Sequence, residues 1–215
     1  MNENIQLAEK TAAAAKAISM IKDNMVVGLG TGSTSKIAIN LLAQKVKQGL
    51  IIKAVATSKE SFSLAQNLGI KVEETFSKID FTFDGADKVD PQNQLIKGYG
   101  GALFREKIVA KASSFYVIMV DKSKLTKDFC NIPIPVEVSS FGLALTEKKI
   151  IDLGAKINLR SSPNGPFTTD NHNFILDCSF ETIQNLEDLE TSLKLITGVI
   201  ETGLFLNLAD KVIVG

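Results

Sequence analysis

The side chains best suited to chemistry lie in one stretch, residues 84–107. It begins with Asp84 and Asp87, continues to Lys97 and reaches Glu106, with three glycines between the last two. Carboxylates accept and donate protons, and a lysine with exposed backbone amides stabilises negative charge on a carbonyl oxygen. Glycines let the backbone approach a ligand closely. This combination of residue types suits proton abstraction next to a carbonyl group.

A second candidate site is the segment Gly-Leu-Gly-Thr-Gly-Ser-Thr at residues 28–34. It follows an apolar run expected as a buried strand and precedes an apolar pattern typical of a helix, so a helix N-terminus would face an anion. The third glycine of a dinucleotide fingerprint is replaced by Ser33, and the Gly-Lys-Ser/Thr of a P-loop is absent. We therefore predict a phosphate loop with hydroxyl donors from Thr31, Ser33 and Thr34. A tight turn without a ligand is the alternative.

Composition narrows the class of protein. The chain has 215 residues, is 45% hydrophobic and carries a formal net charge of +0, which suits one large domain, or a larger and a smaller one, and gives no basic excess for nucleic acid. No apolar run is long enough to cross a membrane. Cys130 and Cys178 are expected to be reduced, in a cytosolic protein. The single histidine, His172, is expected in a surface turn, so a histidine-based metal site or a Ser-His-Asp triad is not expected.

Helix and strand patterns alternate over the first 125 residues. A helix is expected at 4–22, and further helices are expected after residues 34, 57 and 106. Strands are expected at 25–29, 51–56, 70–72, 79–83 and 115–120. Thr57 and Glu60 have the spacing of a capping box, and Gly69 suits a helix C-terminus. The alternation predicts an α/β fold with a doubly wound, mostly parallel sheet.

The pattern changes near Asn131. The segment Ile-Pro-Ile-Pro-Val-Glu-Val cannot be a central parallel strand, because prolines are confined to sheet edges and strand starts. Helices are then expected at 141–153 and around 186–196, with strands at 155–159, 174–178 and 198–202. This βαββαβ order is that of a smaller ferredoxin-like α+β domain. We predict domains at 1–130 with 205–215 and at 131–204, because the last apolar run should return to the first sheet.

Six motifs, in order, resemble those of ribose-5-phosphate isomerase, type A. They are V-G-L-G-T-G-S-T, F-D-G-A-D, I-K-G-Y-G-G-A-L-F-R-E-K, P-V-E-V, T-D-N-H-N-F-I-L-D and G-V-I-E-T-G-L-F. The resemblance implies a cytoplasmic homodimer or homotetramer of the pentose phosphate pathway. It implies interconversion of ribose 5-phosphate and ribulose 5-phosphate through an enediolate, with a phosphosugar as substrate. It also implies no metal, cofactor, nucleic acid or membrane partner.

The resemblance also implies roles for individual residues. Glu106 takes the place of the base, and Asp84, Asp87 and Lys97 take the catalytic, sugar-contacting places. The remaining substrate-binding places fall on Lys10, Thr31, Gly32, Ser33, Thr34, Gly85, Ala86, Gly98, Tyr99, Gly100 and Lys124. Two positions depart from the family pattern: Tyr99 stands inside K-G-G-G, and His172 stands inside T-D-N-G-N. We expect Tyr99 to have ordinary backbone angles and a ring that points away from the sugar, since left-handed angles cost a non-glycine residue about 1–2 kcal/mol.

Other interpretations remain open at the level of sequence. A related fold can serve another sugar-phosphate isomerase or a deaminase, which a panel of substrates distinguishes. A non-catalytic sugar-phosphate sensor would need a helix-turn-helix or a basic face, and neither is apparent. The two aspartates, Asp84 and Asp87, could also hold Mg²⁺ with water in its other positions.

Overall fold

The computed structural model describes residues 3–215 and divides them into two compact units. Unit 1 contains the chain up to Ala86, Arg105–Leu125 and Leu208–Gly215; unit 2 contains Asp87–Phe104 and Thr126–Asn207. The predicted division assigned residues 87–104 to the first domain. In the structure this segment groups with unit 2, because its two short strands pair with each other and the second of them, Leu95–Ile96, also pairs with a strand at Leu204–Phe205.

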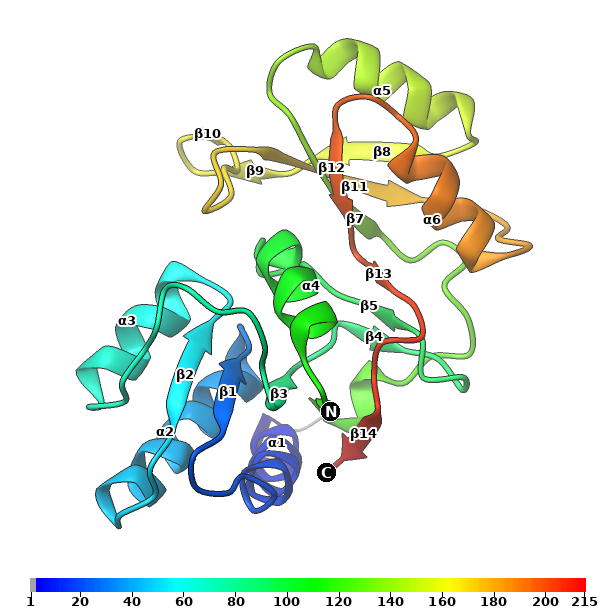
Figure 1. The fold of residues 1–215 in the computed structure, drawn as a ribbon. Coiled ribbons are helices and arrows are strands. Elements are labelled where there is room, and N and C mark those ends of the chain that lie inside the picture. The colour runs from blue at the N-terminus through cyan, green and yellow to red at the C-terminus, as the bar shows by residue number, and fades with distance from the viewer. Residues whose placement is uncertain (1–2) are drawn as a thin grey trace. The chain divides into compact units, whose positions relative to one another are not determined.

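Unit 1 is built on a five-stranded parallel sheet in the order β14-β6-β3-β1-β2 (Figure 1). Its strands are β1 (Val26–Leu29), β2 (Lys53–Ala56), β3 (Phe81–Asp84), β6 (Tyr116–Val120) and β14 (Lys211–Val214). The helices are α1 (Glu3–Ile18), α2 (Ser33–Lys47), α3 (Lys59–Asn67) and α4 (Leu103–Ala112), with a short 3₁₀ helix η1 (Lys122–Lys124). The final strand returns to this sheet beside β6, as predicted.

The sheet of unit 1 has an apolar core on each face. Val27 and Ala54 pack into the core that also contains residues of α1 and α2. Their neighbours Val26 and Val55 pack into a second core with Val109 of α4. Because successive residues of a strand point to opposite faces, a sheet covered on both sides needs strands that are apolar throughout. This explains why the strands read as continuous apolar runs, and it makes the sheet doubly wound.

Two local predictions in unit 1 are wrong. The expected strand at 70–72 forms only an isolated bridge, between Val72 and Ala54. The expected capping box is also absent, because the N-cap of α3 is Ser58, whose side chain accepts a hydrogen bond from the amide of Ser61. The hydroxyl of Thr57 instead donates to the carbonyl of Leu29 at 3.0 Å.

Unit 2 contains the predicted βαββαβ arrangement. Its elements are β7 (Ile134–Val138), α5 (Leu143–Asp152), β8 (Lys156–Leu159), β11 (Phe174–Ser179), α6 (Leu186–Lys194) and β12 (Val199–Thr202). The strands form an antiparallel sheet in the order β12-β7-β11-β8, and residues of α5 and α6 share one apolar core with it. A hairpin of β9 (Ser161–Ser162) and β10 (Gly165–Pro166) follows β8, and β4 (Lys88–Val89), β5 (Leu95–Ile96) and β13 (Leu204–Phe205) form a separate small sheet.

The proline-containing strand β7 lies inside its sheet, between β12 and β11. It is antiparallel to both neighbours, and Pro135 lies beyond the last residue of β12, which is opposite Val136. The carbonyl of Pro135 accepts a hydrogen bond from the amide of Gly203, and the carbonyl of Gly203 accepts from the amide of Lys97, so no N–H is needed from Pro135 on this side. His172 occupies a turn before β11 with a φ of 64°, which is a left-handed backbone conformation.

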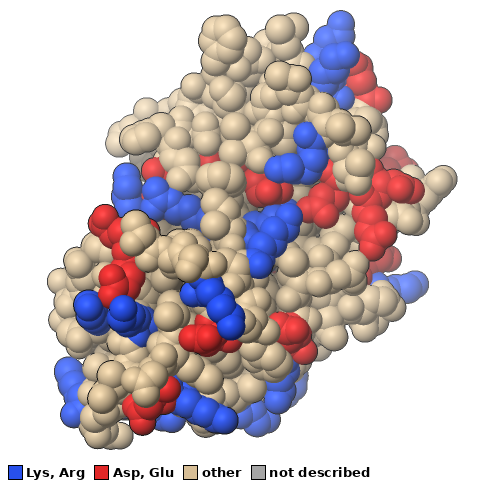
Figure 2. Space-filling view, in the orientation of Figure 1, with Lys and Arg blue, Asp and Glu red and all other residues tan. Residues whose placement is uncertain are grey.

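Surface properties follow the composition. Basic and acidic side chains are interspersed on the face shown in Figure 2. Cys178 is buried and Cys130 is partly buried, and both are free thiols. Within residues 3–215, the helices are too short or too polar to cross a membrane.

Candidate active site

Asp84 is the most enclosed acid of the predicted site. It is the last residue of β3 and is fully buried. Its Oδ1 accepts hydrogen bonds from the amide of Gly85 at 2.7 Å, the amide of Thr31 at 3.1 Å and the hydroxyl of Ser35 at 3.2 Å. A buried carboxylate needs such donors to offset lost hydration. Gly30 makes the close approach possible, since a Cβ there would lie 2.1 Å from Oδ1.

Tyr116 of β6 adds a phenol that the sequence reasoning missed. Its side chain is buried, and its hydroxyl donates to Oδ2 of Asp84 at 3.5 Å. Burial raises the pKa of this phenol well above its usual value, and the charges of Asp84 and Glu106 raise it further. Tyr116 therefore remains a neutral donor beside two acids. A signal was present, because a tyrosine in an otherwise apolar strand usually finds a polar partner.

Glu106 lies in the first turn of α4 and is only 5% exposed. The N-terminal end of a helix favours a negative charge, because unpaired amides and the helix dipole face it. Glu106, Asp84 and Tyr116 thus form a buried cluster of two acids and a phenol in unit 1. Such a cluster is typical of sites that move protons.

The predicted phosphate loop joins β1 to α2. Its Gly32 has a φ of 99°, and no side chain caps the start of α2. Lys10 of α1 donates from Nζ to Oγ of Ser33 at 3.2 Å, and its Nζ lies 3.9 Å from a carboxylate oxygen of Asp121. Asp121 also caps η1, the short helix that contains Lys124. A lysine and an uncapped helix start therefore lie together, and both favour an anion.

The loop hydroxyls differ in their surroundings. The hydroxyl of Thr31 lies 2.7 Å from that of Thr57 and 2.9 Å from that of Ser58, so it is held within the fold. Ser33 is exposed, and Thr34 is buried. The predicted set of three hydroxyl donors is thus spread over three environments, and Ser33 is the one beside Lys10.

Unit 2 carries the other predicted acid and the lysine. The carboxylate of Asp87 accepts a hydrogen bond from the amide of Tyr99 at 2.9 Å. Lys97 is only 2% exposed, its amide donates to the carbonyl of Gly203 at 2.9 Å, and its Nζ lies 5.4 Å from the ring centroid of Phe205. The end of β5 therefore presents Lys97 just before the glycine loop, residues 98–101.

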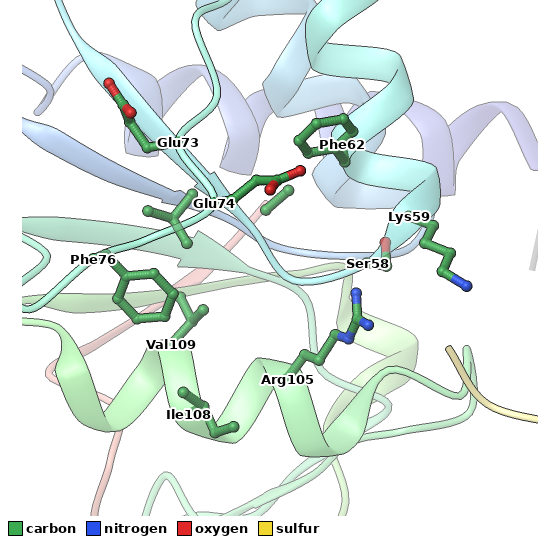
Figure 3. Close-up of a pocket in the computed structure, with 11 residues that line it drawn as sticks. Ser58, Lys59, Phe62, Glu73, Glu74, Phe76, Arg105, Ile108 and Val109 are labelled. Carbon is green, nitrogen blue, oxygen red and sulfur yellow. The ribbon is translucent and has the colours of Figure 1, made fainter. Parts of the chain in front are cut away.

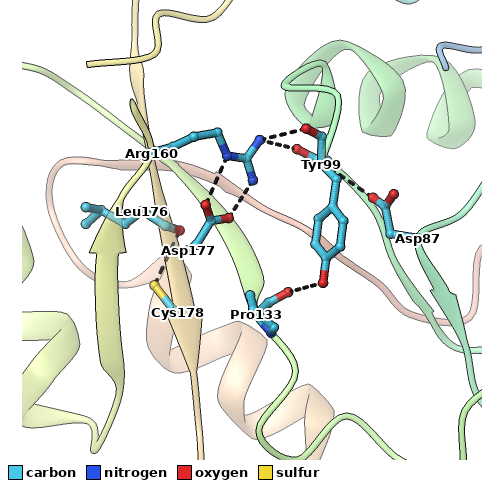
Figure 4. Close-up of polar contacts among 8 residues, drawn as sticks. Asp87, Tyr99, Pro133, Arg160, Leu176, Asp177 and Cys178 are labelled. Atoms are coloured by element: carbon cyan, nitrogen blue, oxygen red, sulfur yellow. Dashed lines mark hydrogen bonds and ion pairs between the residues drawn. The ribbon is translucent and has the colours of Figure 1, made fainter. Parts of the chain in front are cut away.

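Tyr99 fits the glycine loop without backbone strain. Among residues 3–215, the non-glycine residues with positive φ are all Asn or His, whereas Gly98 and Gly101 have φ of 106° and 80°. The Tyr99 hydroxyl donates to the carbonyl of Pro133 at 3.1 Å (Figure 4). Burial, then the charges of Asp87 and Asp177, raise the pKa of Tyr99 to about 12, against the opposing effect of Arg160. The expected ordinary backbone angles are confirmed.

A cavity of about 590 Å³ lies in unit 1 between α3 and α4, away from the predicted residues (Figure 3). Phe62, Phe76 and Val109 give it an apolar wall, and Lys59 and Arg105 give it cationic groups. None of the predicted site residues lines it. The predicted site is therefore defined by its buried acids and its loops, and not by this cavity.

Comparisons with known proteins identify the family. The sequence profile of ribose 5-phosphate isomerase A (phosphoriboisomerase A) matches residues 53–215. The ribose-5-phosphate isomerase A of Bacillus mycoides (strain KBAB4) is 46% identical over 209 residues, which cover 96% of this chain and 95% of that protein. The chain belongs to the ribose 5-phosphate isomerase A family.

Solved structures of the family have the same fold. A D-ribose-5-phosphate isomerase in complex with phospho-erythronic acid matches with a TM-score of 0.92 at 40% identity, over 99% of this chain and 96% of that one. The ribose 5-phosphate isomerase from Plasmodium falciparum matches with a TM-score of 0.88 at 36% identity, over 93% and 90% of the two chains. The resemblance and the predicted fold class are confirmed. Membership in this family decides against the deaminase and sensor alternatives.

Residues 3–215 contain no group of three or more His, Cys, Asp or Glu side chains placed to hold a metal ion. Neither departure from the family motifs removes an acidic or basic group of the predicted site.

Proposed function

We propose that Glu106 is the base that moves a proton between carbons 1 and 2 of the sugar phosphate. As a ribose-5-phosphate isomerase, the protein interconverts ribose 5-phosphate and ribulose 5-phosphate in the pentose phosphate pathway. The reaction takes a proton from carbon 2 of the aldose and returns it to carbon 1, with an enediolate between the two steps. One carboxylate that reaches both carbons can perform both transfers. The observation that carries this proposal is the burial of Glu106 beside Asp84 and Tyr116.

The other charged residues divide the remaining tasks. Negative charge grows on the carbonyl oxygen as the enediolate forms, and Lys97 with the amides of the glycine loop stabilises it. One such donor contributes about 2.7–4 kcal/mol to the transition state. Asp84 and Asp87 exchange protons with the sugar hydroxyls and assist ring opening. The hydrogen bonds to Oδ1 of Asp84 support this role, because they fix the orientation of its carboxylate.

The phosphate of the substrate binds at the start of α2. Ser33 and Lys10 contact the phosphate, and backbone amides of the loop complete the site. Lys124, on η1 and three residues after Asp121, is a further candidate contact. A relative was solved in complex with phospho-erythronic acid, so a protein of this family binds a phosphorylated ligand. A fixed phosphate keeps the two reacting carbons in register with Glu106.

The remaining properties of the enzyme are proposed from the family resemblance. The protein acts in the cytoplasm as a homodimer or homotetramer. It needs neither a metal ion nor a nucleotide for turnover. Activity after exhaustive dialysis against EDTA tests the second point, since recovery only on adding Mg²⁺ would contradict it.

The decisive experiment replaces Glu106 with glutamine and measures isomerisation of ribose 5-phosphate in a coupled assay. Glutamine keeps the size of the side chain and cannot take the proton, so kcat should fall by at least about a hundredfold. Glu181→Gln is the control, because it makes the same change at an exposed position of unit 2. Binding of phospho-erythronic acid should survive in both variants. Near-normal turnover in Glu106→Gln would remove Glu106 from the mechanism.

A further inference from the structure

Arg160, between β8 and β9, contacts the glycine loop of unit 2 (Figure 4). Its Nε and Nη2 donate to the two carboxylate oxygens of Asp177 on β11, at 3.0 and 2.5 Å. Its Nη1 donates to the carbonyl of Gly98 at 2.7 Å and to that of Tyr99 at 3.1 Å. One guanidinium thus joins a strand of the four-stranded sheet to two successive peptide groups of the loop.

These contacts meet at a single peptide group. The carbonyl of Gly98 and the amide of Tyr99 belong to the same peptide plane. Arg160 binds its oxygen, and the carboxylate of Asp87 binds its N–H. Hydrogen bonds in such a chain polarise one another and strengthen together. The orientation of this peptide therefore sets the direction of Asp87 and the path of the backbone just after Lys97.

We propose that Arg160, oriented by Asp177, is a positioning residue for catalysis, which fixes the backbone that carries Lys97 and directs Asp87. This inference rests on the proposed roles of Lys97 and Asp87. The glycine loop needs such support, because two of its glycines have positive φ and it continues no strand ladder. A planar guanidinium can provide this support. When a carboxylate accepts hydrogen bonds from Nε and Nη2, the direction of the third nitrogen, Nη1, is fixed as well.

A surface ion pair of little consequence is the alternative explanation. The side chains of Arg160 and Asp177 are only 14% and 19% exposed, so solvent screens their interaction little. In addition, Nη1 of Arg160, which does not contact Asp177, donates to two carbonyls of the loop, which a simple surface ion pair would not require. The bidentate geometry and the two carbonyl contacts together favour the positioning role.

The test compares Arg160→Lys, Arg160→Ala and Asp177→Asn, with Lys156→Gln as the matched control. Lys156 is an exposed cation on the neighbouring strand β8 and lines the same surface hollow. Lysine keeps the charge and loses the fork, so Arg160→Lys should lower kcat by about ten- to a hundredfold, the scale of a misplacement of about 1 Å. Asp177→Asn should lower it in the same direction, and Lys156→Gln should leave it unchanged. Binding of phospho-erythronic acid should change less than kcat.

Chemical rescue separates positioning from a general loss of structure. Guanidinium ion at low, non-denaturing concentration should restore part of the kcat of Arg160→Ala in a saturable manner and leave the wild type unaffected. A kcat of wild-type size in Arg160→Lys, or losses in all variants that only follow the folded fraction without rescue, would overturn the proposal. Lys97→Met distinguishes a failure of the proposed role of Lys97 from a failure of the positioning role of Arg160. If it is fully active, the assigned role of Lys97 fails; if it is inactive while Arg160 variants keep their kcat, only the positioning role fails.

Discussion

Tyr116 shows how burial decides the chemistry of a single residue. Its phenol lies close to Asp84 and Glu106, the two carboxylates that the proposed mechanism uses. It can donate a hydrogen bond only while it is protonated. Burial and the charges of Asp84 and Glu106 both raise its pKa, so it keeps its proton to a higher pH than an exposed tyrosine does. The residue therefore supplies a hydrogen bond to Asp84 without adding a third negative charge to the cluster.

The raised tyrosine pKa values predict an alkaline limit to stability. Unfolded tyrosines lose their protons near pH 10, whereas Tyr99 in the folded protein keeps its proton to about pH 12, and Tyr116 is shifted in the same direction. The unfolded state then binds fewer protons than the folded state above about pH 10, so stability should fall as the pH rises from there. Thermal unfolding at a series of pH values measures this. Tyr116→Phe should flatten the decline more than Tyr99→Phe, because Tyr99 is 41% exposed.

The absorbance of tyrosinate can test directly whether the two tyrosines keep their protons above pH 10. The chain has two tyrosines and no tryptophan, so the near-ultraviolet signal reports these two side chains. In the native protein this signal should stay flat past pH 10 and should rise together with unfolding. Titration of both tyrosines near pH 10 with the fold intact would contradict the burial argument for Tyr116.

At the scale of elements, the start of α2 and the side chain of Lys10 on α1 are expected to act together on the phosphate. Lys10→Met should raise KM for ribose 5-phosphate by about tenfold or more, because a charge-assisted hydrogen bond to a phosphate is worth about 1.5–3 kcal/mol. Inhibition by unphosphorylated ribose should hardly change. Lys16→Met is the control, since Lys16 is an exposed lysine of the same helix. Equal losses for both ligands would place the phosphate elsewhere.

Element boundaries were less predictable than element types. The strands of the parallel sheet could be predicted because a run covered on both faces is apolar throughout, as at Tyr116–Val120. The start of α3 was predicted one residue too early, because Thr57 and Ser58 are both good capping residues and Glu60 completes the capping-box spacing only for Thr57. The structure uses Ser58 as the cap, since the Thr57 hydroxyl is engaged with Leu29. A tertiary contact thus overrode a local pattern.

The sequence indicated the candidate residues that lie in motifs, and it missed the residues that contact them from other elements. Glu106, Asp84 and Lys97 stand in motifs whose residue types indicate chemistry. Arg160 and Asp177 lie 17 residues apart, and only the pairing of β8 with β11 brings them together. The pattern of apolar and polar residues in the strands does not indicate that the guanidinium of Arg160 donates to carbonyls of the glycine loop.

At the scale of the whole molecule, the division into units depends on strands of two residues. β4, β5 and β13 are too short to produce a periodic pattern, so the sequence reasoning assigned residues 87–104 to the first domain. The return of the chain to unit 1 was predictable, because the last residues form an apolar run after a clear break.

The last strand, β14, is predicted to be essential for the stability of unit 1. Ile213 is buried in the core that includes α1, and the amide of Gly215 donates to the carbonyl of Val120 at 3.1 Å. Removing a buried isoleucine side chain leaves a cavity, so Ile213→Ala should lower the free energy of unfolding by about 2–5 kcal/mol in denaturant titration. Lys211→Ala, at an exposed position of the same strand, should change it by less than about 0.5 kcal/mol. Similar small effects of the two substitutions would mean that β14 adds little to the sheet, and that unit 1 is complete with its first four strands.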